Sequence, residues 1–213
     1  MDVKVTHSLS LIRKALRDHE RVAVACSFGK DSIVTLHLAR RVNSEIPVFA
    51  VMTPFKPKET IQFMEQVRKI WKLNLTVYQA NVELTSELKE LHKKDPDKCC
   101  SIFKVAPCRR AVKNLDAWIS GLRKDEGRTR TNYQEVEFRG LAKINPILSW
   151  TEADLWRYTA THNLPVHPFY KLGYRSLGCA CCSEPNTTEE RGGRWKGTSK
   201  CGGECGIHTR DLK

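Results

Sequence analysis

The sequence predicts a single α/β domain built on a parallel β-sheet, and two observations support that prediction. Short apolar runs typical of buried strands alternate along the chain with longer stretches typical of helices. The order strand, helix, strand, helix, strand favours parallel strands joined by crossover helices. The length of 213 residues is enough for one domain with a hydrophobic core, and 40% hydrophobic with 28% charged residues is typical of a globular chain.

The first part of the chain contains three apolar runs short enough for strands, RVAVA, IPVFAVM and NLTVYQA, with segments of helical length between and after them. We therefore expect, in order, a helix at 8–19, strand Arg21–Ala25, helix Ile33–Val42, strand Ile46–Met52, helix Lys58–Lys72, strand Asn74–Ala80 and a helical stretch to Lys94.

Fewer regular elements are expected in the second half of the chain. The run AWISGL predicts a fourth strand at Ala117–Leu122, and Glu135–Ile144 is expected to add edge strands. Thr151 is suited to cap an amphipathic helix over about 152–162, because two acidic residues follow it in the first turn.

From Gly173 onward the chain is rich in Gly, Cys, Arg and Pro. We expect an irregular segment there, held by something other than a hydrophobic core. We therefore divide the chain into an α/β domain at 1–178 and a C-terminal segment at 179–213.

The chain is strongly basic, with a formal net charge of +12 and a pI of about 9.4. Such a surface attracts polyanions, but its Lys and Arg residues are spread along the chain, and a small, highly anionic ligand would also use several of them. Charge alone does not choose between nucleic acid and a small anionic ligand. No apolar run approaches the roughly 20 residues of a membrane helix, and the start lacks the pattern of a secretory signal, so we expect a cytoplasmic protein without membrane contact.

The segment between the first expected strand and the next helix, Cys26–Ser32 (CSFGKDS), has the composition of an anion-binding loop. Open parallel sheets bind ligands at the carboxyl ends of their strands. A glycine-containing turn there presents backbone N–H groups, the helix N-terminus adds partial positive charge, and Lys30 adds a full charge. The segment matches neither G-x-x-x-x-G-K-[ST] nor G-x-G-x-x-G, and an ordinary strand-to-helix turn is the alternative.

Nine cysteines are a high number for a chain of this length. In a reducing cytosol, clustered cysteines more often bind metal or act in catalysis than form disulfides. Two pairs stand out, and together they can hold zinc or an iron–sulfur cluster. Adjacent cysteines strain a mononuclear zinc site but can reach two irons of one cubane cluster. The pairs are Cys99 with Cys100 and Cys179 with Cys182, whereas Cys26 and Cys108 stand alone and are expected to be small buried side chains.

The anion-binding loop resembles the pyrophosphate loop of the adenine nucleotide alpha-hydrolase superfamily, usually Ser-Gly-Gly-Lys-Asp-Ser, with Phe28 in place of the first glycine. This resemblance implies a Rossmann-like fold. The superfamily includes RNA-thiolating enzymes, synthetases and sulfonucleotide reductases, so the loop alone does not select a reaction.

The cysteine pattern makes the resemblance specific. Cys-Cys, 78 intervening residues and Cys-x-x-Cys is similar to the pattern of cluster-containing adenylyl-sulfate reductases. The resemblance covers Val22 to His208 and includes the words KCCSIFKVAPCRRAV, ISGLRKDEGRTR, INPILSWTEADLWRYTATHNLP, GYRSLGCACC, RGGRW and ECGIH.

The resemblance implies a [4Fe-4S] cluster on Cys99, Cys100, Cys179 and Cys182. It also implies that the cysteine of ECGIH, Cys205, is the nucleophile. A thiolate there is favoured by the cations nearby, and a short terminal segment is easily moved. A surface thiol or a fifth metal ligand is the alternative reading of Cys205. We assign no role to Cys201 or Cys181.

The resemblance also implies counterparts in this chain of the family's sulfate-binding positions. Several of them are arginines, whose planar guanidinium groups suit oxyanions. We assign catalytic roles to His208 and Lys104 beside Cys205. The expected substrate-binding residues are Ser27, Gly29, Lys30, Arg130, Arg191 and Arg194, with Arg123 as a further candidate.

Two groups of residues receive a structural interpretation. His167 departs from the asparagine of the family and receives no role in catalysis. The tryptophans are expected to pack in the protein interior rather than to stack on bases; they are Trp71, Trp118, Trp150, Trp156 and Trp195.

The resemblance implies a reductase that converts adenylyl sulfate to sulfite and AMP through a Cys205 S-sulfonate, with thioredoxin or glutaredoxin as reductant, in sulfate assimilation. The 3′-phosphorylated substrate is an alternative. Two other classes are weighed against it: an RNA-thiolating ATP pyrophosphatase, and a zinc-binding nucleic-acid module without enzymatic activity. Nucleic acid is not the expected partner, and the sequence leaves a homo-oligomer open.

Overall fold

Six strands form one sheet in the computed structural model, which describes residues 1–186, 188–200, 203–209 and 211–212. The strand order is β3–β2–β1–β4–β6–β5, and every neighbouring pair is parallel except β5 with β6. The predicted single α/β domain on a parallel sheet is therefore confirmed. The strands are β1 (Val22–Ala25), β2 (Val48–Val51), β3 (Leu75–Tyr78), β4 (Ala117–Ile119), β5 (Val136–Phe138) and β6 (Ala142–Ile144).

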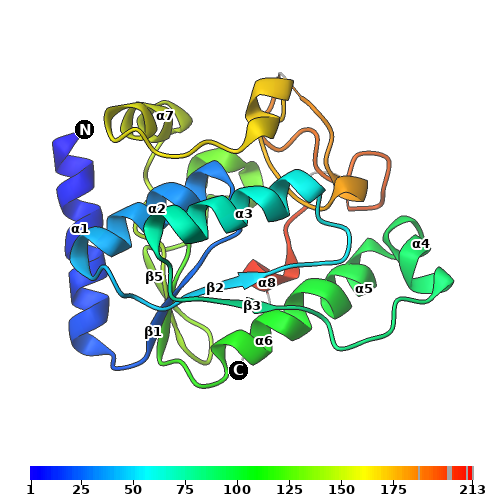
Figure 1. The fold of residues 1–213 in the computed structure, drawn as a ribbon, viewed down its shortest axis with the longest axis horizontal. Helices are drawn as coiled ribbons and strands as arrows, with labels where there is room; N and C mark the ends of the chain where they lie inside the picture. Colours follow the sequence, from blue (N-terminus) through cyan, green and yellow to red (C-terminus); the bar gives the residue numbers. More distant parts are fainter. Residues whose placement is uncertain (187, 201–202, 210, 213) are drawn as a thin grey trace.

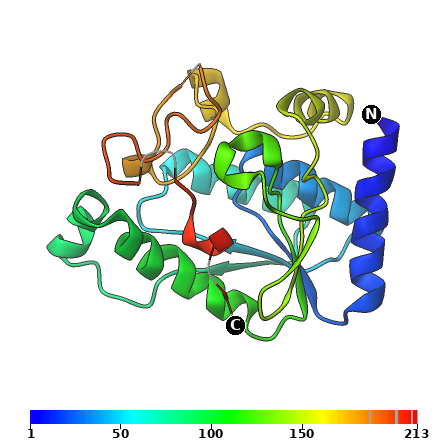
Figure 2. The ribbon, with the colours of Figure 1, turned by 180° about the vertical axis from the view of Figure 1, so that it is seen from behind.

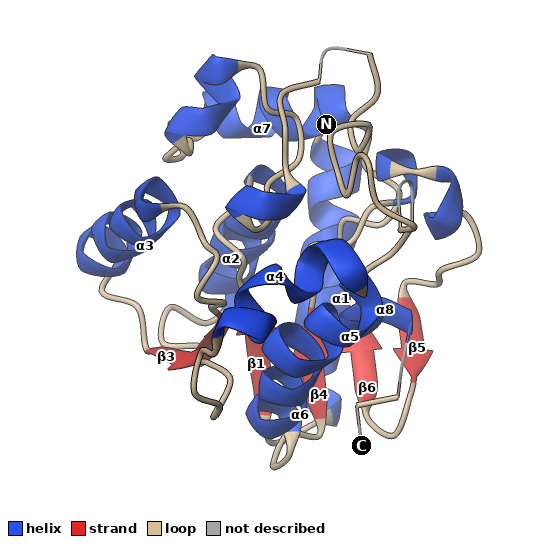
Figure 3. Cartoon of the chain, turned by 90° about the vertical axis from the view of Figure 1, so that its right-hand side faces the viewer, coloured by secondary structure: helices blue, strands red, loops and turns tan. Residues whose placement is uncertain are grey.

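Helices cover both faces of this sheet. Figure 1 shows α2 and α3 on one side and α5 and α6 on the other, and Figure 3 shows the same layers from the end of the molecule. The helices are α1 (Asp2–Asp18), α2 (Lys30–Val42), α3 (Lys58–Trp71), α4 (Ser86–Lys94), α5 (Pro96–Cys100), α6 (Ala106–Val112), α7 (Glu152–Thr161) and α8 (Gly206–Thr209).

The alternation of side chains along β1 divides the core into two parts. Val22 and Val24 pack with apolar residues of α1, α2 and α3, whereas Ala23 packs with Val112 of α6 on the opposite face. Because strands buried on both faces need apolar residues at every position, β1 reads as a continuous apolar run. This is the pattern that predicted the parallel sheet.

The pair formed by β5 and β6 differs from the expectation of edge strands at Glu135–Ile144. Only β5 lies at the edge, while β6 lies between β5 and β4 with all three of its residues buried. A hairpin with Gly140 at φ 73° joins the two strands and reverses the direction of the chain. No residue of the edge strand β5 is buried, and Phe138 is 79% exposed. The strand therefore needs no continuous apolar run.

The N-terminal helix begins earlier than predicted, at Asp2 instead of residue 8. Its buried positions are Ser8, Leu9, Ile12 and Ala15, so the first two turns contribute little to the core. Val3, for example, is 83% exposed. The apolar pattern marks only the part of a helix that is packed, and the exposed turns therefore escaped the prediction.

The segment after Gly173 is irregular, as predicted. Its regular elements among the described residues are a 3-10 turn at Ala180–Cys182 and the short α8. Figure 2 shows this segment crossing above the sheet and descending toward α6 at its end. Cys201 lies outside the described residues. Within the described ranges, no helix combines the length and apolar character needed to cross a bilayer.

Candidate active site

A cavity of about 1130 Å³, counting the space open to solvent, lies at the carboxyl ends of β1, β2 and β4. Strands β2 and β3 lie on one side of β1, and β4, β6 and β5 lie on the other. The strand order therefore reverses at β1, and open α/β sheets bind ligands at such a topological switch point. The cavity wall brings together eight of the predicted residues: Ser27, Gly29, Lys104, Arg130, Arg191, Arg194, Cys205 and His208.

The loop between β1 and α2 turns sharply at Phe28, which adopts a left-handed conformation with φ 62° and is fully buried. A bulky residue rarely adopts this conformation, which favours glycine. Packing of the phenyl ring offsets the strain. The turn places Gly29 at the N-cap of α2, and the backbone N–H of Lys30 donates to the Tyr170 hydroxyl at 2.8 Å.

This turn supports a prediction about stability. Replacing Phe28 by alanine removes the buried ring and keeps the strain, whereas glycine removes both, so F28G is expected to be more stable than F28A by about 1 kcal/mol. Both are expected to be less stable than the parent by roughly 2–5 kcal/mol. Urea unfolding of the three proteins measures this, and an F28A variant at least as stable as F28G would contradict the strain argument.

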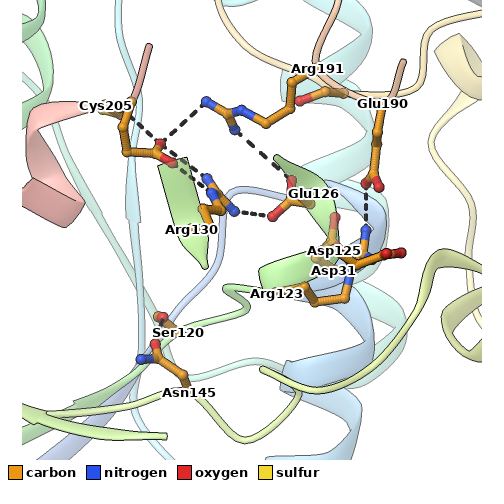
Figure 4. Close-up of polar contacts among 12 residues, drawn as sticks. Asp31, Ser120, Arg123, Asp125, Glu126, Arg130, Asn145, Glu190, Arg191 and Cys205 are labelled. Carbon is orange, nitrogen blue, oxygen red and sulfur yellow. Dashed lines mark hydrogen bonds and ion pairs between the residues drawn. The ribbon is translucent and has the colours of Figure 1, made fainter. Parts of the chain in front are cut away.

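Lys30, predicted to bind phosphate, does not line the cavity wall. Its ammonium donates to Glu190 at 2.5 Å and to the carbonyl of Arg175 at 2.8 Å. Arg123, a further candidate from the sequence, is fully buried and pairs with Glu190 and with Asp31 of α2. Figure 4 shows the carboxylate of Glu190, from the C-terminal segment, pointing toward Arg123 and Asp31. We name Lys30, Asp31, Arg123 and Glu190 the buried ion network.

The loop after β4 approaches the start of α2 very closely. A Cβ atom on Gly121 would lie 3.0 Å from the backbone of Asp31. Glycine is needed at this position because any side chain would push the two loops apart. The close approach brings two walls of the cavity together.

A helical segment that the sequence did not predict runs from α5 to α6. A π-helical turn, Ser101–Val105, joins the two helices. Such turns are rare and often occur at functional sites. This turn carries Lys104, while Cys99 and Cys100 end α5. Burial lowers the pKa of Lys104, but the cysteines Cys179, Cys205 and Cys100 outweigh that effect and raise it above the ordinary lysine value.

The four predicted cluster ligands, Cys99, Cys100, Cys179 and Cys182, are all buried. Three of them pack together with Trp195, and the hydroxyl of Thr53 lies 3.1 Å from the Cys179 sulfur. Cys181, which the prediction leaves out of the ligand set, is exposed, and its sulfur lies 3.6 Å from the sulfur of Cys182. The predicted burial of Cys26 and Cys108 is confirmed.

The chemistry of this pocket fits a cluster better than a single zinc ion. Zinc bonds of about 2.3 Å hold sulfurs roughly 3.8 Å apart. Among the described residues, the one group of three potential ligand atoms that lie within 4.8 Å of one another consists of carboxylates. These carboxylates form ion pairs with basic residues. The described cysteine sulfurs form no such group of three, so they are too far apart for one zinc ion. The buried indole N–H of Trp195 finds no acceptor among the described residues, and cluster sulfides accept such hydrogen bonds.

Cys205 lies at the wall of the cavity next to this pocket. A hydrogen bond from Cys100 and the charge of Lys104 outweigh burial and lower the pKa of Cys205 to about 5. A Cys100 that binds the cluster has no thiol proton to donate, and the charge of Lys104 and a hydrogen bond from the backbone N–H of Ile207 then favour the Cys205 thiolate, the nucleophilic form of cysteine.

Glu204, directly before Cys205, binds two of the predicted arginines. Its carboxylate accepts from Arg130 at 2.6 and 3.0 Å and from Arg191 at 3.2 Å. It also accepts from the backbone N–H of Cys205 at 2.8 Å. Glu126 binds Arg130 from the other side, as Figure 4 shows. Both arginines are therefore held in place by carboxylates within the protein.

Arg194 and His208 complete the wall. Arg194 donates to the carbonyl of Leu177 at 2.9 Å and lies over the Trp195 ring at 4.4 Å. His208 stacks on Trp118 with an interplanar angle of 9°. Burial and the charge of Lys143 hold the pKa of His208 well below its ordinary value, so the imidazole is neutral.

The sequence interpretation missed several residues of this site. Three of them are the glutamates Glu126, Glu190 and Glu204, because carboxylates are not expected where an anion binds. Tyr170 was also missed, because it comes from a turn far away in the sequence. Lys56, after β2, lines the cavity, and burial lowers its pKa to about 8. The available signal was its position: Lys56 follows a predicted strand at the edge where the other loops meet.

The chain matches the phosphoadenosine phosphosulfate reductase domain family over residues 21–185. It is 39% identical over 197 residues to the adenosine 5′-phosphosulfate reductase of Anoxybacillus flavithermus, covering 86% of this chain and 82% of the relative. The adenosine 5′-phosphosulfate reductase 1 of Bacillus subtilis is 35% identical, with 94% and 90% covered.

Solved structures agree on the fold. Phosphoadenylyl-sulfate reductase from Candida auris superposes with a TM-score of 0.71 at 21% identity, covering 81% of this chain and 88% of that one. FMN adenylyltransferase from Candida glabrata gives 0.69 at 16% identity, with 86% and 65% covered. The predicted Rossmann-like pyrophosphate-loop fold is confirmed, and the chain belongs to the phosphoadenosine phosphosulfate reductase family.

Proposed function

We propose that the protein reduces adenylyl sulfate to sulfite and AMP, with Cys205 as the nucleophile. The observation that carries this proposal is the position of the Cys205 thiolate in the wall of a cation-lined cavity at the switch point of the sheet. The relatives named adenosine 5′-phosphosulfate reductase support it over most of the chain.

In the first step, the Cys205 thiolate attacks the sulfur of the sulfonyl group in line with the bond to the phosphate oxygen. That S–O bond breaks, and AMP leaves with the electron pair. We propose that Arg130, Arg191 and Arg194, which line the cavity, hold oxyanions while charge moves from the thiolate toward AMP. The product on the enzyme is an S-sulfocysteine.

In the second step, a thiolate of thioredoxin or glutaredoxin attacks the Cys205 sulfur. The sulfur–sulfur bond to the sulfonate breaks, and sulfite leaves with the electron pair. A second thiol of the reductant then resolves the mixed disulfide and restores the Cys205 thiolate. Cys205 belongs to the C-terminal segment, whose described residues form few regular elements and can therefore move toward a partner more easily than the sheet.

Cys99, Cys100, Cys179 and Cys182 are the proposed ligands of a [4Fe-4S] cluster. When bound, the cluster would supply a fixed anionic centre beside the active site, without a change of redox state in the reaction. The charges of Cys179, Cys205 and Cys100 all act on the ammonium of Lys104. We propose that Lys104 positions the sulfonate relative to the thiolate.

The 3′-phosphorylated substrate is a second candidate within the same reaction. The name of the matched domain and of the Candida auris neighbour favours testing it. A cytoplasmic setting in sulfate assimilation follows from the same proposal, because both substrates and the thiol reductants occur there.

The test is sulfite release by protein purified without oxygen, with thioredoxin and either nucleotide. We expect sulfite and AMP in equal amounts from adenylyl sulfate, and the ratio of the two rates identifies the preferred substrate. No sulfite from either nucleotide, with iron and sulfide present at four each per chain and thioredoxin active on another disulfide, would exclude the proposed function.

A further inference from the structure

Lys56 reaches the cavity from a loop that the sequence did not assign to the site. The loop follows β2 and ends where α3 begins at Lys58. The backbone N–H of Lys56 donates to the carbonyl of Thr53 at 3.2 Å, so a turn fixes the start of the side chain. Its side chain is part of the cavity wall.

The guanidinium groups of the cavity wall already have acceptors within the protein. Arg130 and Arg191 bind Glu204, and Arg194 donates to backbone carbonyls. The ammonium of Lys56 differs, because it forms no hydrogen bond or ion pair with any residue in the described part of the chain. A cation that lines a cavity without an acceptor is available to a ligand.

The charges around Lys56 indicate which part of a ligand it would meet. The thiols of Cys179 and Cys205 and the cations Lys104 and Arg194 act on its ammonium. Lys104, Arg194 and Cys205 line the cavity, and Thr53, at the start of the turn that contains Lys56, lies 3.1 Å from the Cys179 sulfur. Lys56 therefore belongs to the end of the cavity that contains the nucleophile and borders the cysteine pocket. The backbone N–H groups of the anion-binding loop lie at the other end of the cavity, where α2 begins.

We propose that Lys56 is a substrate-binding residue whose ammonium donates to a sulfonate oxygen of adenylyl sulfate beside the Cys205 thiolate. This inference rests on the proposed function and adds a residue to it. The attacking thiolate and the sulfonate oxygens both carry negative charge. A cation between them reduces their repulsion as the new sulfur–sulfur bond forms.

The experiment measures binding in a C205S background, in which the substrate does not react. Isothermal titration compares adenylyl sulfate with AMP, which lacks the sulfonate. We expect K56M to weaken binding of adenylyl sulfate by about 10- to 100-fold, the effect of losing one hydrogen bond between charged groups. Binding of AMP is expected to change by less than about twofold, within the ordinary effect of a surface substitution.

Two further variants make the result specific. K58M removes a neighbouring, exposed lysine and is expected to bind both nucleotides like the parent. K56R keeps a donor cation and is expected to recover most of the affinity for adenylyl sulfate, which a loss of folding in K56M would not explain.

Each outcome decides between separate claims. Equal losses for adenylyl sulfate and AMP in K56M would place Lys56 on the phosphate and overturn the inference, as would no loss for either. Failure of the C205S parent to bind either nucleotide would instead remove the proposed function, and the inference with it. Loss confined to adenylyl sulfate supports the inference.

Discussion

Replacing Cys205 by serine is expected to reduce sulfite release by at least about 10⁴-fold, the usual cost of removing a catalytic nucleophile. The serine hydroxyl is not ionised at neutral pH, whereas the charge of Lys104 favours the thiolate of Cys205. We expect C205S to bind adenylyl sulfate and to keep its iron content. Mass spectrometry after incubation with adenylyl sulfate and no reductant should show the S-sulfonate adduct in the parent and none in C205S.

The matched control for this prediction is C181S, because Cys181 is exposed and does not line the cavity. We expect it to keep its iron and to release sulfite at a rate close to that of the parent. Loss of the cluster in C205S would contradict the division between nucleophile and ligands. Loss of iron in C181S would mean that Cys181 is a ligand.

Replacing Arg123 by methionine is expected to destabilise the protein by about 3–5 kcal/mol, because it leaves the carboxylates of Asp31 and Glu190 to share the single charge of Lys30. Arg123 is fully buried and pairs with Asp31 at 2.5 Å and with Glu190. For a chain of this length, the melting temperature should fall by roughly 6–20 °C. Thermal unfolding followed by circular dichroism measures the change.

The control for R123M is R21M, which breaks an arginine–aspartate pair at the surface. Arg21 pairs with Asp116 at 2.7 Å, but its side chain is 62% exposed. Water screens such pairs, so the expected loss is at most about 1 kcal/mol. Similar losses in the two variants would mean that burial of the ion network adds nothing to its contribution.

The parallel sheet could be predicted because β1 and β2 are buried on both faces and therefore appear as uninterrupted apolar runs. The capped helix α7 was also predicted, since Thr151 and the acidic first turn form a capping box. The helix from Pro96 to Val112 was missed. It contains two prolines and a π-helical turn, and both disturb the regular apolar spacing on which helix prediction depends.

Sequence reasoning could predict the site residues that belong to local motifs, but not the contacts between residues far apart in the chain. Lys104, Arg191 and Cys205 occur in recognisable words, and the structure brings them to one cavity. The partner of Lys30 could not be predicted, because Glu190 lies 160 residues away and only the fold brings the two together. The roles assigned to these residues stay predictions until the variants above are measured.

Glu204 and Cys205 are neighbours in the chain and therefore cannot move independently. If the terminal segment carries Cys205 toward a reductant, the carboxylate that neutralises Arg130 and Arg191 leaves with it. The two guanidinium groups would then share the carboxylate of Glu126 as their counter-ion, which is costly unless another anion takes the place of Glu204. Exposure of the nucleophile is thus coupled to occupancy of the cavity: an enzyme that holds AMP or the substrate anion opens at lower cost than an empty one.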